Sequence, residues 1–171
     1  SGCPGGSPED KTPNWVTCPW PDDFSEILEY QWNDVLIPYW KEKVAFAKAH
    51  NVHKIALELH PGFCVYNTRS LLKLREAVGP EIGANLDPSH LIWQGMDLIA
   101  VIRELGKANA IFHFHAKDTK VDAINTAVNG VLDTQHYSEE LTRSWIFRSV
   151  GYGHGEDYWK AIASELRLAG Y

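Results

Sequence analysis

Between residues 54 and 115, short apolar stretches alternate with amphipathic ones, and this alternation restricts the possible fold more than any other feature of the chain. Three stretches are typical of buried strands: 54–59, 82–86 and 110–115. Two stretches are typical of helices that end near a glycine: 69–78 and 97–105. Strands that alternate with helices form βαβ units with parallel strands and right-handed crossovers. We therefore predict an α/β fold with a parallel sheet.

Turn and cap signals predict the rest of the chain. Residues 1–21 are rich in Gly and Pro, which favours a loop. Residues 22–115 hold the βα units and, before them, two helices that divide at Pro38. Residues 116–155 show little periodicity and are interpreted as a long rim loop, which at such a length is usually functional. An amphipathic helix is predicted at 156–169, and the whole of 1–171 is treated as a single domain.

Charge and cysteine content narrow the class of protein. The net charge of -6, without any basic block, disfavours a nucleic-acid partner. The three cysteines, Cys3, Cys18 and Cys64, have no C-x-x-C spacing, so reduced thiols are expected rather than a disulfide framework or a thiolate zinc site. There is no apolar run near 18 residues, and we expect a cytoplasmic protein without a membrane partner.

Three polar residues stand at the ends of the successive predicted strands. Glu58, Asp87 and His115 are separated by 29 and 28 residues, each about one βα unit. Because the carboxyl ends of parallel strands meet at one rim, these side chains are expected to converge. Two carboxylates and an imidazole suit a divalent ion such as Mn, Co, Zn or Mg. For each acid, the alternative is a helix cap or a structural hydrogen-bond acceptor.

The strand predicted at 110–115 carries further polar groups on the face of His115. His113 is interpreted as a core histidine hydrogen-bonded to a neighbour. Lys117 lies one strand position beyond His115 and has two open readings. It stabilises a developing oxyanion, or it pairs with Asp118 or another acid of the rim.

Other residues near the predicted rim are candidates for substrate contact. His60 and His90 follow the predicted ligands closely and would bind substrate or orient the ligands. Trp93 is a candidate for stacking on a sugar, whereas the other aromatic residues are expected in the core and as loop anchors. Arg143 and Arg148 would either clamp a polar substrate or hold the loop in place.

Four motifs together resemble the sugar phosphate isomerase/epimerase family of the xylose-isomerase-like barrel superfamily: Glu58-Leu-His-Pro-Gly, Asn85-Leu-Asp-Pro-Ser-His90, His113-Phe-His-Ala-Lys-Asp118 and Val150-Gly-Tyr-Gly-His154. The resemblance implies a partial (β/α)8 TIM barrel, from about the end of strand 4 to the helix before strand 8 and incomplete at both ends. It also implies a divalent metal, with manganese favoured, at the C-terminal face of the barrel.

Carried over by position, the resemblance assigns the metal ligands Glu58, Asp87 and His115 and a substrate-facing role to His90. A fourth ligand of the family, a Glu on the last strand, has no match in these 171 residues. The missing part of the barrel, or a second copy of the chain, is therefore an expected partner.

The resemblance implies a metal-dependent isomerase or epimerase of a sugar or sugar phosphate, which removes a proton next to a carbonyl and passes through an enediolate. Glu58 is the predicted acid/base and Lys117 a second catalytic candidate. We expect the parent protein to be the enzyme and the 171 residues alone to have little activity. The alternatives are a lyase that acts on 3-keto-glycosides by β-elimination and a non-catalytic sugar-binding barrel. Distant relatives on this barrel cut DNA at abasic sites, but the negative charge disfavours that activity.

Overall fold

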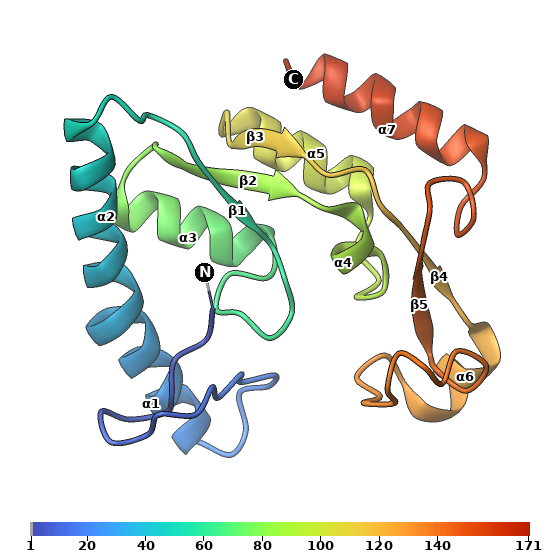
Figure 1. Ribbon diagram of the computed structural model, residues 1–171, viewed down its shortest axis with the longest axis horizontal. Helices are drawn as coiled ribbons and strands as arrows, with labels where there is room; N and C mark the ends of the chain where they lie inside the picture. The colour runs from blue at the N-terminus through green and yellow to red at the C-terminus, as the bar shows by residue number, and fades with distance from the viewer. Residues whose placement is uncertain (1) are drawn as a thin grey trace. The chain divides into compact units, whose positions relative to one another are not determined.

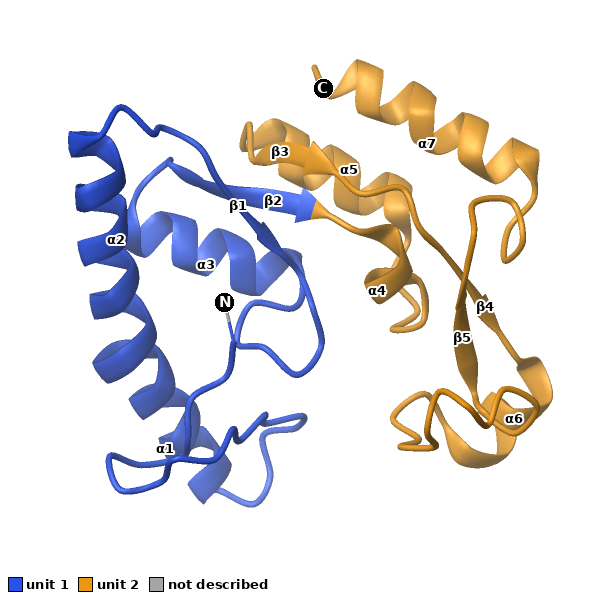
Figure 2. Ribbon diagram, in the orientation of Figure 1, with its two compact units in different colours: residues 1–85 blue, residues 86–171 orange. Residues whose placement is uncertain are grey.

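The computed structural model describes residues 2–171. The chain divides into two compact units, residues up to Asn85 and Leu86–Tyr171, which Figure 2 colours separately. The division falls inside a strand, so the single domain expected over 1–171 stays a prediction. Within residues 2–171, no helix is long and apolar enough to cross a membrane.

The first unit begins with a loop and a continuous helical run, followed by a β-α-β segment (Figure 1). Its elements are α1 (Asp23–Tyr30), the π-helical turn η1 (Gln31–Leu36), α2 (Ile37–Ala49), β1 (Ile55–Glu58), α3 (Thr68–Val78) and most of β2 (Ile82–Leu86). The predicted position of Pro38 in the first turn of a second helix is confirmed, and this helix, α2, follows η1 without an interruption. A wider π-helical turn absorbs a local change in backbone hydrogen bonding, so the helix continues through the proline.

The β-α-β segment confirms the predicted parallel arrangement. β1 pairs with β2 in parallel, with Glu58 opposite Asn85, and the three-stranded sheet has the order β1-β2-β3. The crossover helix α3 starts with a capping box between Asn67 and Ser70 and buries Leu71 and Leu74 completely. Burial of these leucines beside a parallel strand pair is the packing that the apolar periodicity predicts.

The second unit contains the remaining helices and strands: α4 (Pro88–Ile92), α5 (Leu98–Lys107), β3 (Ile111–Phe114), β4 (Asp118–Val121), α6 (Ala123–Asn129), β5 (Trp145–Arg148) and α7 (Glu156–Leu168). The amphipathic helices α5 and α7 run side by side (Figure 1). Arg103 of α5 donates to both carboxylate oxygens of Glu165 on α7, at 2.8 and 3.0 Å. This two-pronged ion pair fixes the relative rotation of the two helices.

The long irregular loop predicted at 116–155 is wrong in part, because this stretch contains β4, α6 and β5. The two strands pair antiparallel, from Asp118 opposite Arg148 to Val121 opposite Trp145. α6 starts directly after β4, where the Asp122 side chain accepts from the N–H groups of Ile124 and Asn125. The 23 residues between the strands far exceed the length of a hairpin turn, so sequence patterns alone did not reveal the pairing.

Strand β3 is less buried than its apolar composition predicts. Its four residues are half-buried or exposed, and His113 is exposed rather than a core histidine. β3 is an outer strand of the sheet, so only one of its edges pairs with a neighbour. An outer strand can keep an apolar sequence while one of its faces stays accessible.

Candidate metal centre

Asp87 immediately follows β2 and is completely buried. One of its oxygens, Oδ1, accepts hydrogen bonds from Ser89 N–H at 2.9 Å and from the Ser89 hydroxyl at 2.6 Å. This places Asp87 at the N-cap of α4, with Pro88 in the first turn of the helix. The helix-cap alternative is therefore correct for this residue, but the cap uses only one of the two carboxylate oxygens.

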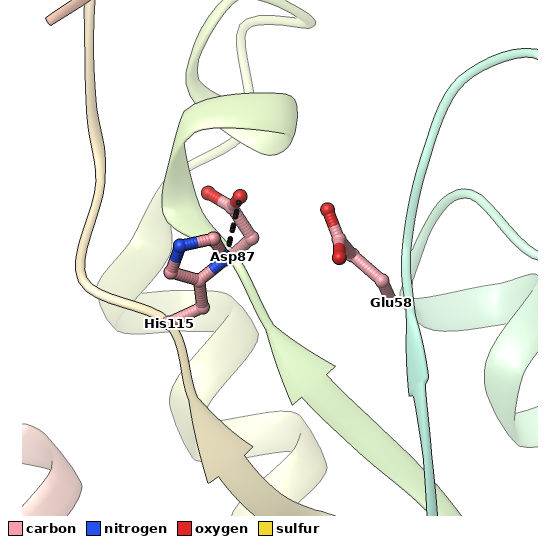
Figure 3. Close-up of side chains that lie close together, drawn as sticks. All are labelled: Glu58, Asp87 and His115. Carbon is pink, nitrogen blue, oxygen red and sulfur yellow. Dashed lines mark ion pairs between the residues drawn. The ribbon is translucent and has the colours of Figure 1, made fainter.

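The other oxygen of Asp87, Oδ2, is buried and accepts no hydrogen bond of normal geometry. Three nitrogen atoms nevertheless surround it: Lys117 Nζ at 2.9 Å, His115 Nδ1 at 3.3 Å and His90 Nε2 at 3.3 Å. Figure 3 draws the ion pair between His115 and Asp87 as a dashed line. A buried carboxylate oxygen is costly unless positive charge compensates it, so this oxygen is suited to a cation.

Lys117 reaches Asp87 from the stretch between β3 and β4. Its ammonium group also lies 4.2 Å from the centre of the Phe147 ring on β5. Of the two alternatives for Lys117, pairing with an acid of the rim is present, and the acid is Asp87 rather than Asp118. The two alternatives do not exclude each other, since an ammonium group that pairs with a carboxylate can also stabilise a nearby oxyanion.

His115 and Glu58 also stand at strand ends. His115 follows β3, its N–H donates to Leu86 O at 2.9 Å, and its side chain is 48% exposed. Glu58 is the last residue of β1 and is half-buried. Within the second unit, Asp87 and His115 each offer one ligand atom to a metal ion, and Glu58 of the first unit stays the third predicted ligand (Figure 3).

This donor set fits a divalent metal. Asp87 Oδ2 is a buried oxygen that accepts no hydrogen bond of normal geometry, and His115 adds an imidazole nitrogen. Oxygen ligands with one imidazole suit Mn, Co, Zn or Mg, in keeping with the absence of a thiolate from the group.

Two of the predicted substrate residues have fixed rings. His90 is 3% exposed, lies beside Asp87 Oδ2 and packs edge-on against Phe147, with ring centres 5.2 Å apart. His60 is half-buried in the first unit, and its Nδ1 lies 2.5 Å from Pro61 O. His90 is thus held at the carboxylate by packing, which suits orienting Asp87 as well as contacting a substrate.

Trp93 and Arg143 lie in an aromatic cluster on the second unit. Trp93 is 6% exposed and stacks on Trp145, with ring centres 4.6 Å apart and planes inclined by 3°. The buried Arg143 donates from Nε to Trp145 O at 3.0 Å, also bonds Gln135 O, and lies over the Tyr137 ring. The contacts of Arg143 agree with the alternative in which it holds the loop. The Trp93 ring is packed against Trp145 rather than open for stacking on a sugar.

Comparison with known proteins agrees with this arrangement of strands. The model of one protein family, described as the xylose isomerase-like TIM barrel, matches residues 13–171. The chain belongs to this family. The α/β fold expected from the sequence, a partial barrel of the xylose-isomerase-like type, is thereby confirmed.

An uncharacterized protein, YfiH of Bacillus subtilis (strain 168), is 47% identical to the chain over 173 residues. The alignment covers all of this chain and 55% of the Bacillus protein. The chain thus spans about half the length of this relative.

The sequence motifs did not reveal the role of Asp118, the last residue of His113-Phe-His-Ala-Lys-Asp118. This completely buried carboxylate accepts hydrogen bonds from five residues, which lie in β4, in the loop after β5 and in α7. The donors are Thr119 N, Gly151 N, Gly153 N, both the backbone and ring nitrogens of His154, and Trp159 Nε1, at 2.8 to 3.2 Å. The Val150-Gly-Tyr-Gly-His154 motif is therefore a loop that wraps around one carboxylate.

Asp118 also fixes the approach to the candidate metal centre. The residue after it, Thr119, donates from its hydroxyl to Ser89 O at 2.8 Å and so joins β4 to α4. Lys117 precedes Asp118, and Ser89 donates to Asp87, the N-cap of α4. The buried Asp118 carboxylate therefore positions the backbone from which Lys117 reaches Asp87.

The hydrogen bonds to Asp118 make stability depend on pH. Burial raises the pKa of this carboxyl, but the bonds from His154, Gly153 and Trp159 outweigh burial and hold the pKa below its usual 3.8. A carboxyl with a lowered folded pKa stabilises the fold above its unfolded pKa, and the contribution is lost as the pH falls through the folded pKa. We expect the free energy of unfolding, measured by urea denaturation, to decrease as the pH is lowered below about 4.

The control for this prediction isolates Asp118 from the other carboxylates. Asp118→Asn removes the ionisable group, so its unfolding free energy should change less with pH below about pH 4 than that of the unmodified chain. Equal pH dependence in Asp118→Asn and the unmodified chain would contradict the assignment.

Proposed function

We propose that the protein is a metal-dependent isomerase or epimerase of a sugar or sugar phosphate, with Glu58, Asp87 and His115 as metal ligands and manganese as the favoured ion. The observation that carries this proposal is Asp87 Oδ2, a buried oxygen without a normal hydrogen bond and with Lys117, His90 and His115 around it. Membership of the xylose isomerase-like family supports a sugar-processing enzyme.

The side chains divide the chemistry among themselves. A bound divalent ion would polarise the carbonyl of a ketose or aldose and hold two adjacent oxygens of the sugar. Glu58 is the proposed base that removes the proton from the carbon next to the carbonyl. Lys117, already fixed by Asp87, offsets the negative charge that develops on the oxygen of the resulting enediolate. His90 keeps the Asp87 carboxylate oriented from its buried position.

Solvent isotope exchange tests this function on many candidate substrates at once. A full-length barrel that contains this segment, loaded with manganese, is incubated in D2O with a panel of ketoses, aldoses and their phosphates. The expected result is deuterium at the carbon next to the carbonyl, together with an epimer or isomer, detected by NMR. The Glu58→Gln variant should lower the exchange rate by about 100-fold or more, because it removes the proposed base.

The same assay separates the alternatives. An unsaturated product from 3-keto-glycosides, without exchange on free sugars, would replace the isomerase with a β-eliminating lyase. Sugar binding without exchange or elimination would indicate a non-catalytic barrel. The 171-residue segment alone is expected to exchange little or no deuterium, and the cytoplasmic location and the oligomeric state stay predictions.

A further inference from the structure

Two cysteines far apart in the sequence lie together in the first unit. Each thiol is the largest influence on the pKa of the other, so the two side chains, Cys3 and Cys64, are neighbours. The Cys64 N–H also donates to Gly2 O at 3.1 Å, so the backbones next to the two cysteines lie side by side. Backbones joined in this way are about 5 Å apart. That spacing falls within the range of roughly 4.4 to 6.8 Å that a disulfide spans between Cα atoms.

The surroundings hold this pair in place. Gln31, which is 1% exposed, donates from Nε2 to Pro4 O at 3.0 Å and to Asn14 O at 2.7 Å. The same nitrogen lies 3.7 Å from Cys3 Sγ, which in turn lies 3.0 Å from Asn14 O. A buried amide on η1 thus fixes the loop that carries Cys3 against the segment that carries Cys64.

The two thiols differ in accessibility and acidity. Cys3 is half-buried, and the hydrogen bond from the Cys64 thiol lowers the pKa of Cys3 despite its partial burial. Cys64 is 5% exposed, and the hydrogen bond to Cys3 together with burial raises its pKa. Because the thiolate is the reactive form, Cys3 is the thiol that reacts first and Cys64 is the thiol that closes the bond.

We propose that Cys3 and Cys64 are a reversible disulfide site, oxidised by thiol-disulfide exchange with a small disulfide such as oxidised glutathione. The Cys3 thiolate attacks one sulfur of oxidised glutathione, whose S–S bond breaks and releases one glutathione thiolate. Cys64 then attacks the Cys3 sulfur of the mixed disulfide, and its proton goes to the second leaving glutathione. Two protein thiols are oxidised, and one glutathione disulfide is reduced to two glutathione molecules.

The bond would join two functional stretches of the first unit. It ties the N-terminal loop to the segment after β1, in which His60 N–H donates to Val65 O at 3.3 Å. Oxidation would therefore hold the loop that carries the substrate candidate His60. The inference uses contacts within the first unit and does not depend on the proposed metal centre.

Tryptic peptides provide a direct test, because the three cysteines fall in three different peptides: 1–11, 12–41 and 55–69. The 171-residue chain is treated with oxidised glutathione, alkylated, digested without reductant and analysed by mass spectrometry. The expected product joins peptides 1–11 and 55–69, two hydrogen atoms lighter than their sum, and disappears on reduction. The closed ring of about 60 residues should raise the Tm by roughly 5 to 10 °C.

Variants make the test specific. Cys18 is exposed, and Cys18→Ser should leave the crosslink unchanged. Cys3→Ser and Cys64→Ser should each abolish it, and Cys64→Ser should leave a stable glutathione adduct on Cys3. Cys64 is buried, so a Cys64→Ser variant that fails to fold would also lack the crosslink. Cys3 is only half-buried, so Cys3→Ser tests the crosslink in a variant that is expected to fold. A stable glutathione adduct on Cys3 of the unmodified chain, or crosslinks through Cys18 alone, would overturn the proposal.

Discussion

Replacement of Asp87 by alanine is expected to weaken binding of a divalent metal by at least about 100-fold, since a ligand is lost and the charge that attracts the ion is removed. Oδ2 of this completely buried residue is the oxygen that Lys117, His90 and His115 surround. Metal content by mass spectrometry and manganese titration calorimetry measure the loss. His115→Ala should weaken binding in the same direction.

The matched control separates metal binding from helix capping, because Asp87 has both roles. Asp97 is the N-cap of α5 and accepts from Ile99 N and Ala100 N at 2.8 and 3.2 Å, but it is exposed. Asp97→Ala should cost about 1 kcal/mol of stability, as the loss of a cap does, and should leave metal affinity unchanged. If a full-length barrel that contains this segment binds no divalent metal, or its Asp87→Ala variant retains the metal, the proposed centre is refuted.

Replacement of Asp118 by alanine is expected to lower the free energy of unfolding by about 3 to 5 kcal/mol, because the variant leaves several buried donors without an acceptor. The donors belong to Thr119, Gly151, Gly153, His154 and Trp159. For a chain of this size, the Tm should fall by roughly 10 °C. Urea denaturation and thermal melts followed by circular dichroism measure both quantities.

A glycine pair in the same loop tests the packing around Asp118 independently. A Cβ at Gly153 would lie 2.4 Å from Thr119 O and 2.6 Å from Asp118 Oδ1, so Gly153→Ala should cost about 3 kcal/mol. A Cβ at Gly155 meets nothing within 4 Å, so Gly155→Ala should cost less than about 1 kcal/mol. Similar stabilities of the two variants would show that the loop does not wrap around Asp118 as described.

The periodicity of the sequence was sufficient for the βα units. Strand β2 lies at the predicted residues 82–86, and α7 begins at Glu156 as expected. Both are local patterns: a short apolar run between turn signals, and an apolar stripe at helical spacing. The matched positions of Glu58 and Asp87 follow from the same repeat, because the parallel register places Glu58 opposite Asn85, two residues before Asp87.

The roles of individual polar atoms were beyond the reach of sequence patterns. Asp87 and Asp118 each stand beside a strand, yet one offers an oxygen suited to a cation and the other has its hydrogen-bonding capacity filled by a loop. The pairing of β4 with β5 and the meeting of Cys3 with Cys64 also join distant parts of the chain.

The sequence by itself determined the repeating βα units, the family and the residue types available for a metal, because these depend on local periodicity and spacing. Tertiary structure alone decided which oxygen of Asp87 stays without a normal hydrogen bond, which acid Lys117 pairs with and what Asp118 anchors. These outcomes depend on burial and on donors contributed by residues far away in the chain, and a local pattern carries no information about either.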